Sequence, residues 1–584
     1  MPTKLSPPKR LFHLPVVMDV IRRMKLIGII DKVVKEDPRS IVSTGDCIGV
    51  MLCAIFSGAH DLYRVRERLD RYDMKTIMRN PKFDIERFPE ERLAKALDDI
   101  WHAGPDKLIT SIAVQLIESF SIKTEFFHFD TTSLTCYGAY EAEDDLQTLS
   151  GDMPPKVTYG HSKDRRPDLK QILYGMMVSS DGGVPVFGQV LDGNQSDNIS
   201  TAAFFARVRS LVEDPRKVVC VADSKGWCGR VLSLIIDQDM RLLSRLPRNH
   251  GVHHTIMSMK WEPTDRIEIQ NKRRKHDPPE IYEFFGCDID ENFTIPEIGE
   301  DGKEITRRSL AVPARAVRVF SSALLKRKIS TLGRIRRREE RQAKAFIRDH
   351  QKRAYACDDD AKRAATRDRR EARYITIDLH ASIQHHDGTY RKGRGRPPKN
   401  KEPGINVPHW RVVYSTSPVA EEVSKDRLKE TSSFIIIRNR QIGWNISDAE
   451  MIMKYKGQYH NEHGFSWMKS RAVMNPVFLK TPHRIASLGF LYCIGLMIWT
   501  IIQRTIRQEL IKKKQLLPHH NRRMTNNITT RFILELFQEV HSQILTHSNG
   551  SHEVFIHGIT QYNARACRCL GSKLSIFKPV FGAN

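Results

Sequence analysis

The sequence predicts an α/β fold, in which a mixed β-sheet with flanking helices stands between two helical regions and is interrupted by a large insertion. Three observations predict it. Apolar residues recur at helical spacing before residue 120 and again after residue 447. Between residues 125 and 247, short runs of β-branched and aromatic residues alternate with amphipathic segments. From 250 to 433 this alternation stops, and charged helical blocks mix with short strands.

The predicted sheet begins with a strand over residues 125–134, which reads EFFHFDTTSL. Residues 171–191 form a hairpin, because two apolar runs flank the turn Asp181-Gly182-Gly183. A helix at 199–212, a strand at 217–222, a helix at 225–238 and a strand at 240–247 follow. The predicted order is therefore β-β-β-α-β-α-β.

The pattern divides the chain into five regions. We expect a helical domain at 1–120, α/β segments at 121–249 and 434–510, a basic insertion at 250–433 and a basic tail at 511–584 that is mostly helical until about 547. Helices at 41–57 and 60–73 would suit a helix-turn-helix, with Arg64, Arg66, Arg68 and Arg71 facing DNA. A plain helical domain with a solvated charged face fits these residues equally well.

The charge of the chain points to a polyanionic partner. It has 94 Lys and Arg against 69 Asp and Glu, a net charge of +25, and lysine and arginine neutralise phosphates. The block 324–374 alone carries roughly ten net positive charges. Arg394 and Arg396 lie in a Gly- and Pro-rich run at 391–399 that resembles the core of an AT-hook, although a plain basic linker fits as well.

One segment, residues 485–502, reaches the length of a membrane span. Gly489, Gly495, Ser487 and Thr500 lower its hydrophobicity, and no second such segment accompanies it, so we favour a helix buried in a large core. The ten cysteines include no CxxC pair and indicate a reduced, intracellular protein. No apolar signal-peptide run is seen near the N-terminus, and we expect no membrane partner.

Three acids stand out: Asp130 in the first strand, Asp223 after the fourth, and Glu462 on a helix that can pack across them. Carboxylates that converge from separated positions are what two Mg²⁺ or Mn²⁺ ions require. Two such ions about 4 Å apart can activate a water and stabilise a leaving oxygen. Each acid alone is more often a cap or turn residue; together they predict a two-metal site.

The helix that carries Glu462 opens with a capping box, Ser447 with Glu450. Tyr455, Gln458, Glu462 and Lys469 are spaced by three, four and seven residues, so we expect them on one helical face. A hydroxyl, an amide and an ammonium beside a metal ligand suit phosphate oxygens next to a scissile bond. The alternative is an amphipathic helix whose polar face merely holds these residues.

Other polar residues near the acids are open to two interpretations. His161, Lys163, Arg165, Arg166 and Lys170 lie between the first two strands, where they would contact the DNA backbone or simply form a surface loop. Trp227 could stack on a base, but core packing is favoured. We expect His128 to point to the face opposite Asp130 and to be structural.

With these acids in this strand order, most of the chain resembles prokaryotic insertion-sequence transposases of the DDE class, specifically the IS4/IS1634-like group. Residues 129–133 (FDTTS), 159–171 (YGHSKDRRPDLKQ) and 221–226 (VADSKG) are similar to the family's segments around the first two acids. Tyr455, Glu462 and Lys469 match its signature on the last helix, in which Gln458 stands where the family has Arg. Lys456 could replace the missing cation.

The resemblance implies a ribonuclease-H-like catalytic domain whose insertion touches transposon-end DNA. It implies that two Mg²⁺ or Mn²⁺ ions are bound by Asp130, Asp223 and Glu462, and that phosphates are oriented by Tyr455, Gln458 and Lys469. It also implies a homodimer that synapses double-stranded transposon ends and joins them to target DNA. This reaction would take place in the prokaryotic cytoplasm, at the nucleoid. A ribonuclease-H-like nuclease without strand transfer and a non-catalytic DNA-binding derivative are the alternatives.

Overall fold

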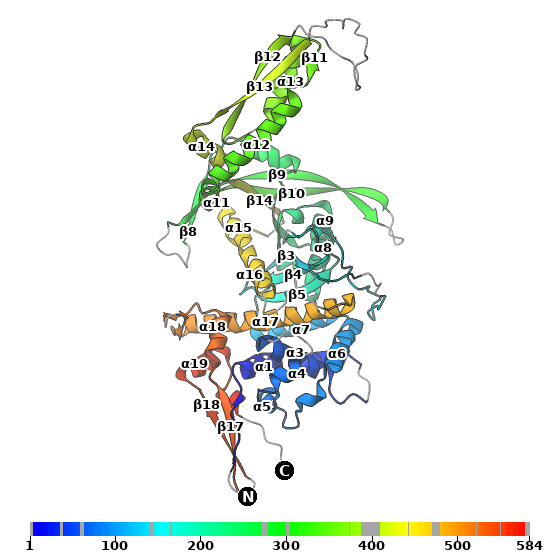
Figure 1. Ribbon diagram of the computed structural model, residues 1–584, viewed down its shortest axis with the longest axis vertical. Helices are drawn as coiled ribbons and strands as arrows, with labels where there is room; N and C mark the ends of the chain where they lie inside the picture. The colour runs from blue at the N-terminus through cyan, green and yellow to red at the C-terminus, as the bar shows by residue number, and fades with distance from the viewer. Residues whose placement is uncertain are drawn as a thin grey trace, which may run out of the picture. The chain divides into compact units, whose positions relative to one another are not determined.

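The computed structural model describes residues 4–35, 39–58, 64–140, 145–163, 166–270, 278–298, 304–372, 374–386, 409–441, 443–469, 479–520, 523–548 and 551–578 (Figure 1). The chain divides into two units. The first comprises Met1–Pro247, Asp288–Arg315 and Ile437–Asn584, and the second comprises Arg248–Cys287 and Ala316–Ile436. The domain boundaries expected from the sequence stay predictions.

The first unit is built on a mixed sheet, so the predicted α/β class is confirmed. Its strands are β3 (Phe126–Thr135), β4 (Gln171–Ser179), β5 (Pro185–Leu191), β6 (Val219–Ala222) and β7 (Arg241–Arg245), in the order β5-β4-β3-β6-β7. Strands β3, β4 and β5 pair antiparallel, whereas β6 is parallel to β3 and β7 is parallel to β6. This order and these directions are those of the ribonuclease-H-like sheet expected from the sequence.

The sheet order continues through β14 (Ser433–Asn439), β10 (Glu304–Ser321), β9 (Glu280–Ile298) and β8 (Asp265–Ile269). The strands β14, β10 and β9 each contain residues of both units. At these three crossings the chain passes between the units inside a strand, whereas the crossing from Pro247 to Arg248 lies in the connection after β7.

Helices cover both faces of the five-stranded part of the sheet. On one face α8 (Asp197–Ala206) packs on β3, where the Phe204 and Phe129 ring centroids are 4.5 Å apart. The helix α9 (Gly229–Asp237) packs beside α8 and on β7. On the other face α17 (Pro482–Lys512) approaches closely enough for the Tyr174 hydroxyl to donate to the Gly489 carbonyl at 3.1 Å.

Helix α17 is long and apolar enough to cross a membrane by length and composition, with a mean hydropathy of 2.1 over its most apolar window. Yet 83% of that window is buried within the structure. It packs between the sheet and the N-terminal helices, in contact with β5, α6 and α7 (Figure 1). The interpretation as a buried core helix is therefore confirmed.

The N-terminal region contains seven helices in its described residues: α1 (Leu14–Arg23), α2 (Leu26–Val33), α3 (Thr44–Phe56), α4 (Val65–Leu69), α5 (Met74–Met78), α6 (Glu90–Ala103) and α7 (Pro105–Phe120). The helix expected at 60–73 is shorter in its described part, and residues 60–63 lie outside the described residues. Helix α4 ends at Leu69, and Asp73 starts α5 by accepting a hydrogen bond from the Thr76 amide at 3.2 Å. Arg66, expected to face DNA, pairs with Glu86 at 3.1 Å.

The C-terminal tail differs from the expectation that it is mostly helical until about residue 547. After α18 (Thr530–Glu535) come β17 (His541–Thr546), β18 (His552–His557) and α19 (Gln561–Leu570). Strand β17 pairs with β18 and with the N-terminal strands β1 (Lys4–Leu5) and β2 (Lys9–Arg10). Two further short strands, β15 (Leu517–Pro518) and β16 (Met524–Thr525), pair with each other. The partner of β17 lies at the far end of the sequence, which a local pattern cannot reveal.

The second unit holds a small α/β layer of its own. Its helices are α10 (Gly251–Ser258), α11 (Ser322–Ile329), α12 (Leu332–His350), α13 (Asp358–Glu371) and α14 (Glu421–Thr431). The strands β11 (Ala354–Tyr355), β13 (His409–Pro418) and β12 (Ile377–His386) form a sheet in that order. Ala361, Leu379, Val412 and Tyr414 are core residues of this layer.

Replacing Arg504 by Met is expected to destabilise the first unit strongly. Its guanidinium, 7% exposed, pairs with Asp181, 11% exposed, and also donates to the carbonyls of Phe120 and Ser121, each at 3.0 Å. The variant leaves a buried carboxylate without its cation, which typically costs about 3–5 kcal/mol. Urea unfolding followed by circular dichroism measures this loss. Arg531→Met, which removes a 77% exposed partner of Glu535, is the control and should change little.

Stability is expected to fall as the pH drops from about 6.5 to about 4, because of His13. Its Nε2 is hydrogen-bonded to the Phe56 carbonyl at 2.9 Å, and burial lowers the pKa of the imidazole from 6.5 to about 4. Between these pH values the unfolded chain binds a proton that the folded protein does not, so the free energy of unfolding falls by up to about 3 kcal/mol. Urea midpoints at pH 7 and 4.5 measure it. His13→Gln should flatten the dependence, whereas the exposed-site control His102→Gln should not; equal slopes in all three proteins would contradict it.

Candidate functional site

Two of the predicted acids lie on neighbouring parallel strands: Asp130 is in the middle of β3, and Asp223 directly follows β6. The register pairs His128 with Val221, so that Asp130 and Asp223, two residues further on, come to the same level on neighbouring strands. Alternate side chains of a strand share a face. Both carboxylates therefore follow the face that carries His128 and Val221.

A short turn after β6 sets the direction of Asp223. The Asp223 carboxylate accepts the Lys225 amide at 3.0 Å, and its carbonyl accepts the Gly226 amide at 3.0 Å and the Ser244 hydroxyl at 2.6 Å. A Cβ on Gly226 would lie 2.5 Å from that of Ala222, so a larger residue would push the turn away from the strand. The segment Asp223-Ser-Lys-Gly thus ends β6 at a defined point.

The electrostatics of Asp130 reflect a site short of positive charge. Burial raises the pKa of this carboxyl, and the nearby Asp223 and Asp197 raise it further. The shift is opposed by the Lys163 ammonium, 3.6 Å from Oδ1, and by the Thr131 amide, which donates to Oδ1 at 2.7 Å. Like-charged carboxylates held close together favour a cation between them. Their oxygen atoms suit a hard divalent ion such as Mg²⁺, so the residues present fit the predicted metals.

The helix expected to carry the third acid is interrupted. Its start is as predicted: Ser447 and Glu450 form a capping box at the head of α15 (Asp448–Tyr455). A 3₁₀ turn, η6 (Lys456–Gln458), then separates α15 from α16 (Tyr459–Met468). Because η6 is a 3₁₀ turn and Lys469 lies beyond α16, the expectation of one continuous helix is wrong. The common face of the four side chains stays a prediction, since those of Gln458 and Glu462 lie outside the described residues.

This segment covers the face of the sheet that holds Asp130. A Cβ on Gly457 would lie 2.8 Å from the His128 ring, and one on Gly464 would lie 2.6 Å from the terminal methyl of Met176, which pairs with Asp130 across β3 and β4. His128 thus shares the face of Asp130, and the expectation of opposite faces is wrong because residues i and i+2 of a strand point the same way.

Glu462 belongs to α16, which lies against β3 and β4. The side chains of Glu462 and Gln458 are outside the described residues. Among the side chains that the structure does describe, no three His, Cys, Asp or Glu residues form a group able to hold a metal ion. The three-acid metal site therefore stays a prediction, with two of its members adjacent.

A tyrosine and an arginine complete the surroundings of the two aspartates. Tyr455 ends α15, and burial raises the pKa of its hydroxyl, an effect that Arg245 opposes and that Asp223 and Asp130 increase. Arg245 ends β7, where the parallel register pairs Ser244 with Ala222 and so brings Arg245 level with Asp223. The sequence interpretation missed Arg245; its position at the end of the strand after Asp223 was the available signal.

The other predicted phosphate contacts are placed only in part. The Lys163 ammonium donates to the carbonyl and hydroxyl of Thr131, inside the site. Arg166 pairs with Asp168 at 2.7 Å on the surface. Lys469 directly follows α16. Arg165, Arg394 and Arg396 lie outside the described residues, and the expected DNA contacts of this whole group stay predictions.

Trp227 belongs to the core. Its side chain is 2% exposed, and its indole N–H donates to the Glu291 carboxylate at 3.3 Å. The Phe293 ring packs edge-on against it, with centroids 6.4 Å apart. The favoured core interpretation is confirmed, because a residue this buried offers no face to a base.

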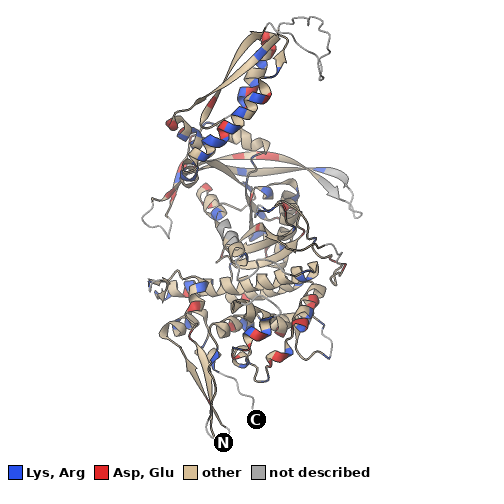
Figure 2. Ribbon diagram, viewed as in Figure 1, with Lys and Arg blue, Asp and Glu red and all other residues tan. Residues whose placement is uncertain are grey.

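Within the second unit, Lys and Arg recur along α12 and α13 (Figure 2). Exposed arginines of α12 are Arg334, Arg336, Arg337, Arg338, Arg341 and Arg348. The opposite side of the helix is anchored by the buried Glu339, whose carboxylate accepts the Ile375 and Thr376 amides at 2.9 and 2.8 Å. This anchor turns the basic side outward, where a role on phosphates stays a prediction.

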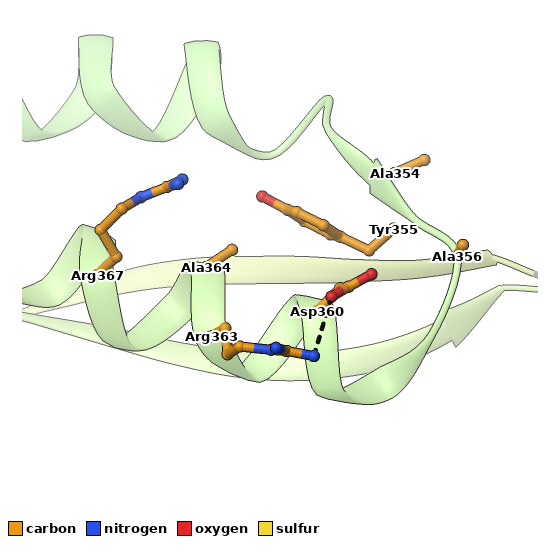
Figure 3. Close-up of a pocket in the computed structure, with 7 residues that line it drawn as sticks. All are labelled: Ala354, Tyr355, Ala356, Asp360, Arg363, Ala364 and Arg367. Atoms are coloured by element: carbon orange, nitrogen blue, oxygen red, sulfur yellow. Dashed lines mark ion pairs between the residues drawn. The ribbon is translucent and has the colours of Figure 1, made fainter.

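A cavity of about 510 Å³ opens beside α13 in the second unit (Figure 3). It is lined by Ala354, Tyr355, Ala356, Asp360, Arg363, Ala364 and Arg367. Asp360 is the one acid among these residues, and it pairs with Arg363 at 3.3 Å. The cavity lacks paired carboxylates and is not the candidate site.

Comparison with known proteins gives a partial match. Residues 7–114 match the model of a domain of unknown function (DUF4277). No protein with a curated description matches the chain. Among solved structures, a synaptic complex of piggyBac transposase with hairpin DNA is similar, with 8% identity, a TM-score of 0.37 and coverage of 92% of this chain and 83% of that one.

A Mos1 transposase paired-end complex with the left transposon end is also similar, with 8% identity and a TM-score of 0.14 over 38% of this chain and 64% of that one. TM-scores this low do not establish a shared fold. The sheet topology and the site therefore carry the interpretation.

Replacing Gly457 by Val is expected to displace the segment that covers Asp130. The new side chain would begin 2.8 Å from the His128 ring, and such overpacking typically costs about 1–3 kcal/mol. Limited proteolysis should then cut faster between residues 456 and 469 than in the wild type. Gly333→Ala is the control, because no atom lies within 4 Å of its added Cβ. Equal rates for all three proteins would show that η6 does not rest on His128.

Proposed function

We propose that this protein is a DNA transposase that cuts transposon ends in a metal-dependent reaction and joins them to target DNA. The observation that carries the proposal is the placement of Asp130 and Asp223. Asp130 lies within β3, on the sheet face that α16, the helix of Glu462, covers, and Asp223 directly follows the neighbouring parallel strand β6. A ribonuclease-H-like strand order with carboxylates at these positions is the arrangement expected of a two-metal phosphoryl transferase.

The proposed reaction has two displacements at phosphorus. In the first, water attacks a phosphodiester at the transposon end; the P–O3′ bond breaks, the 5′-phosphate stays on the flanking strand, and the leaving O3′ takes up a proton. In the second, that 3′-hydroxyl attacks a target phosphodiester and loses its proton. One P–O3′ bond breaks as another forms, so no cofactor energy is needed.

The chain's own residues would position the reactants. Asp130, Asp223 and Glu462 would hold two Mg²⁺ or Mn²⁺ ions, which when bound supply Lewis-acid activation and neutralise charge on the phosphate. Arg245 and Tyr455, beside the aspartates, would orient phosphate oxygens. Arg245 would thereby provide the guanidinium that is absent at Gln458. Lys469 and Gln458 keep the phosphate-orienting role predicted from the sequence.

Composition and the N-terminal match support a DNA substrate. The net charge of +25 and the exposed arginines of α12 suit a polyanion. Residues 7–114 match a domain family often found in transposases. A prokaryotic origin, membership of the IS4/IS1634-like group, a homodimer in a synaptic complex and a place at the nucleoid are parts of the same proposal.

Replacing Glu462 by Gln or Asp130 by Asn is expected to abolish end cleavage while the protein still binds DNA. A lost ligand removes several kcal/mol of charge stabilisation, so the rate should fall at least about a thousandfold. The measurement is cleavage of labelled DNA that carries the element's own ends, with Mg²⁺ or Mn²⁺ and with EDTA. A supercoiled target in the same tube detects joining.

Glu421→Gln is the matched control, because Glu421 is 69% exposed and pairs with Lys425 at the head of α14. It should cut like the wild type. Equal cutting by Glu462→Gln would remove Glu462 from the site. Cutting without joining would favour a nuclease, and binding without cutting by the wild type would favour a non-catalytic DNA-binding derivative.

A further inference from the structure

A third aspartate, Asp197, connects β3, the strand of Asp130, to the turn that begins at Asp223 after β6. It stands at the first position of α8. One of its carboxylate oxygens accepts the Thr131 hydroxyl at 2.9 Å, and the other pairs with the Lys225 ammonium. Thr131 directly follows Asp130, and Lys225 is the second residue after Asp223. A single carboxylate therefore holds both neighbours of the predicted metal ligands.

Asp197 reaches these partners from the back of the sheet. Thr131 alternates with Asp130 and therefore points to the other face, where α8 packs against Phe129 through Phe204. Asp130, by contrast, shares its face with Met176 and His128, which α16 and η6 cover. Among the described side chains, Asp197 does not form a three-acid group with Asp130 and Asp223 that could hold a metal ion.

The surroundings of Asp197 are rigid enough for it to act as an anchor. The loop before α8 lies close against the start of β4, since a Cβ on Gly193 would lie 2.1 Å from the Gln171 carbonyl oxygen. Thr131 is 3% exposed and the Asp197 side chain 19% exposed, so the bond between them is shielded from water. Shielded charge-assisted hydrogen bonds are stronger than exposed ones.

Lysines complete the network. The Lys163 ammonium, 3.6 Å from Asp130, also donates to the Thr131 hydroxyl, which in turn donates to Asp197. Although burial opposes it, hydrogen bonds from Lys225 and Thr131 hold the pKa of Asp197 below its ordinary value. Asp197 is thus held as an anion between Lys225 and the Thr131–Lys163 pair.

We propose that Asp197 is a positioning residue, which fixes the spacing of Asp130 and Asp223 by holding Thr131 and Lys225 from behind the sheet. This rests on the proposed function, because it assigns Asp197 a part in the same metal site. Carboxylates that orient ligands from outside the metal shell typically matter about 10–100-fold in metal affinity or activity. A ligand of the metal, by contrast, would be needed for binding itself.

Asp197→Asn is expected to lower the cleavage rate by about 10–100-fold and to weaken Mn²⁺ binding less than Asp130→Asn does. The asparagine oxygen still accepts from Thr131, but the ion pair with Lys225 is lost. Free Mn²⁺ is counted by electron paramagnetic resonance on the full chain. Asp130→Asn should raise the dissociation constant by at least about tenfold, as expected of a ligand.

A second readout does not need turnover. Fe²⁺ with ascorbate and peroxide cuts the backbone next to a bound ion, so wild-type fragments should end near residues 130 and 223. In Asp197→Asn the cutting near 223 should fall several-fold relative to that near 130, because the Lys225 turn is no longer held. Lys225→Met should give the same pattern, and the double variant should be no worse than either single one.

Asp214→Asn is the matched control: Asp214 also starts a helical turn and pairs with Arg216, at 2.8 Å, but touches neither strand end. If Asp197→Asn lost Mn²⁺ binding as Asp130→Asn does, Asp197 would be a metal ligand and the inference would be overturned. The inference would also be overturned if Asp197→Asn kept the Fe²⁺ cutting pattern and the turnover of the wild type. If the wild type binds Mn²⁺ but does not cut DNA, the proposed function fails, and the Fe²⁺ pattern still decides the role of Asp197.

Discussion

The parallel pairing of β3 with β6 is the constraint on which the rest of the site depends. It joins two segments almost a hundred residues apart in sequence, Phe126–His128 and Val219–Val221, in one register. A slip of one residue would send one carboxylate to the opposite face, since side chains alternate. The aromatic packing of α8 on β3 and the cover of α16 on the other face both follow from this register.

The same pairing brings negatively charged carboxylates close together, and lysines supply positive charge next to them. Asp130 and Asp223 are brought together in front of the sheet, where burial raises the pKa of Asp130. Lys163 supplies positive charge next to Asp130, and Lys225 does so next to Asp197 behind the sheet. These two lysines offset part of the negative charge that the pairing brings together.

Features that depend on neighbouring residues could be predicted from the sequence, whereas features that depend on distant residues could not. The strand runs, the hairpin turn and the Ser447–Glu450 capping box depend on neighbouring residues, and the structure has them. The helix expected at 60–73 ends early, at Leu69, and the Asp73 amide donates instead to the distant Arg10 carbonyl. The roles of Arg245 and Asp197 were missed because they depend on residues that are distant in sequence, namely Asp223 and Thr131. Glu462 could be named only from its spacing and the family resemblance.

The pairing of the N-terminal strands with β17 has a consequence for the order in which the molecule can be completed. Lys4 pairs with Thr546, so the first strand has no partner until nearly the whole chain has left the ribosome. At about 5–20 residues per second, that edge stays open for tens of seconds or longer. During this time it is an unpaired strand near a growing polypeptide. A product that stops before β17 would therefore leave Lys4 and Leu5 without this pairing and open to proteases.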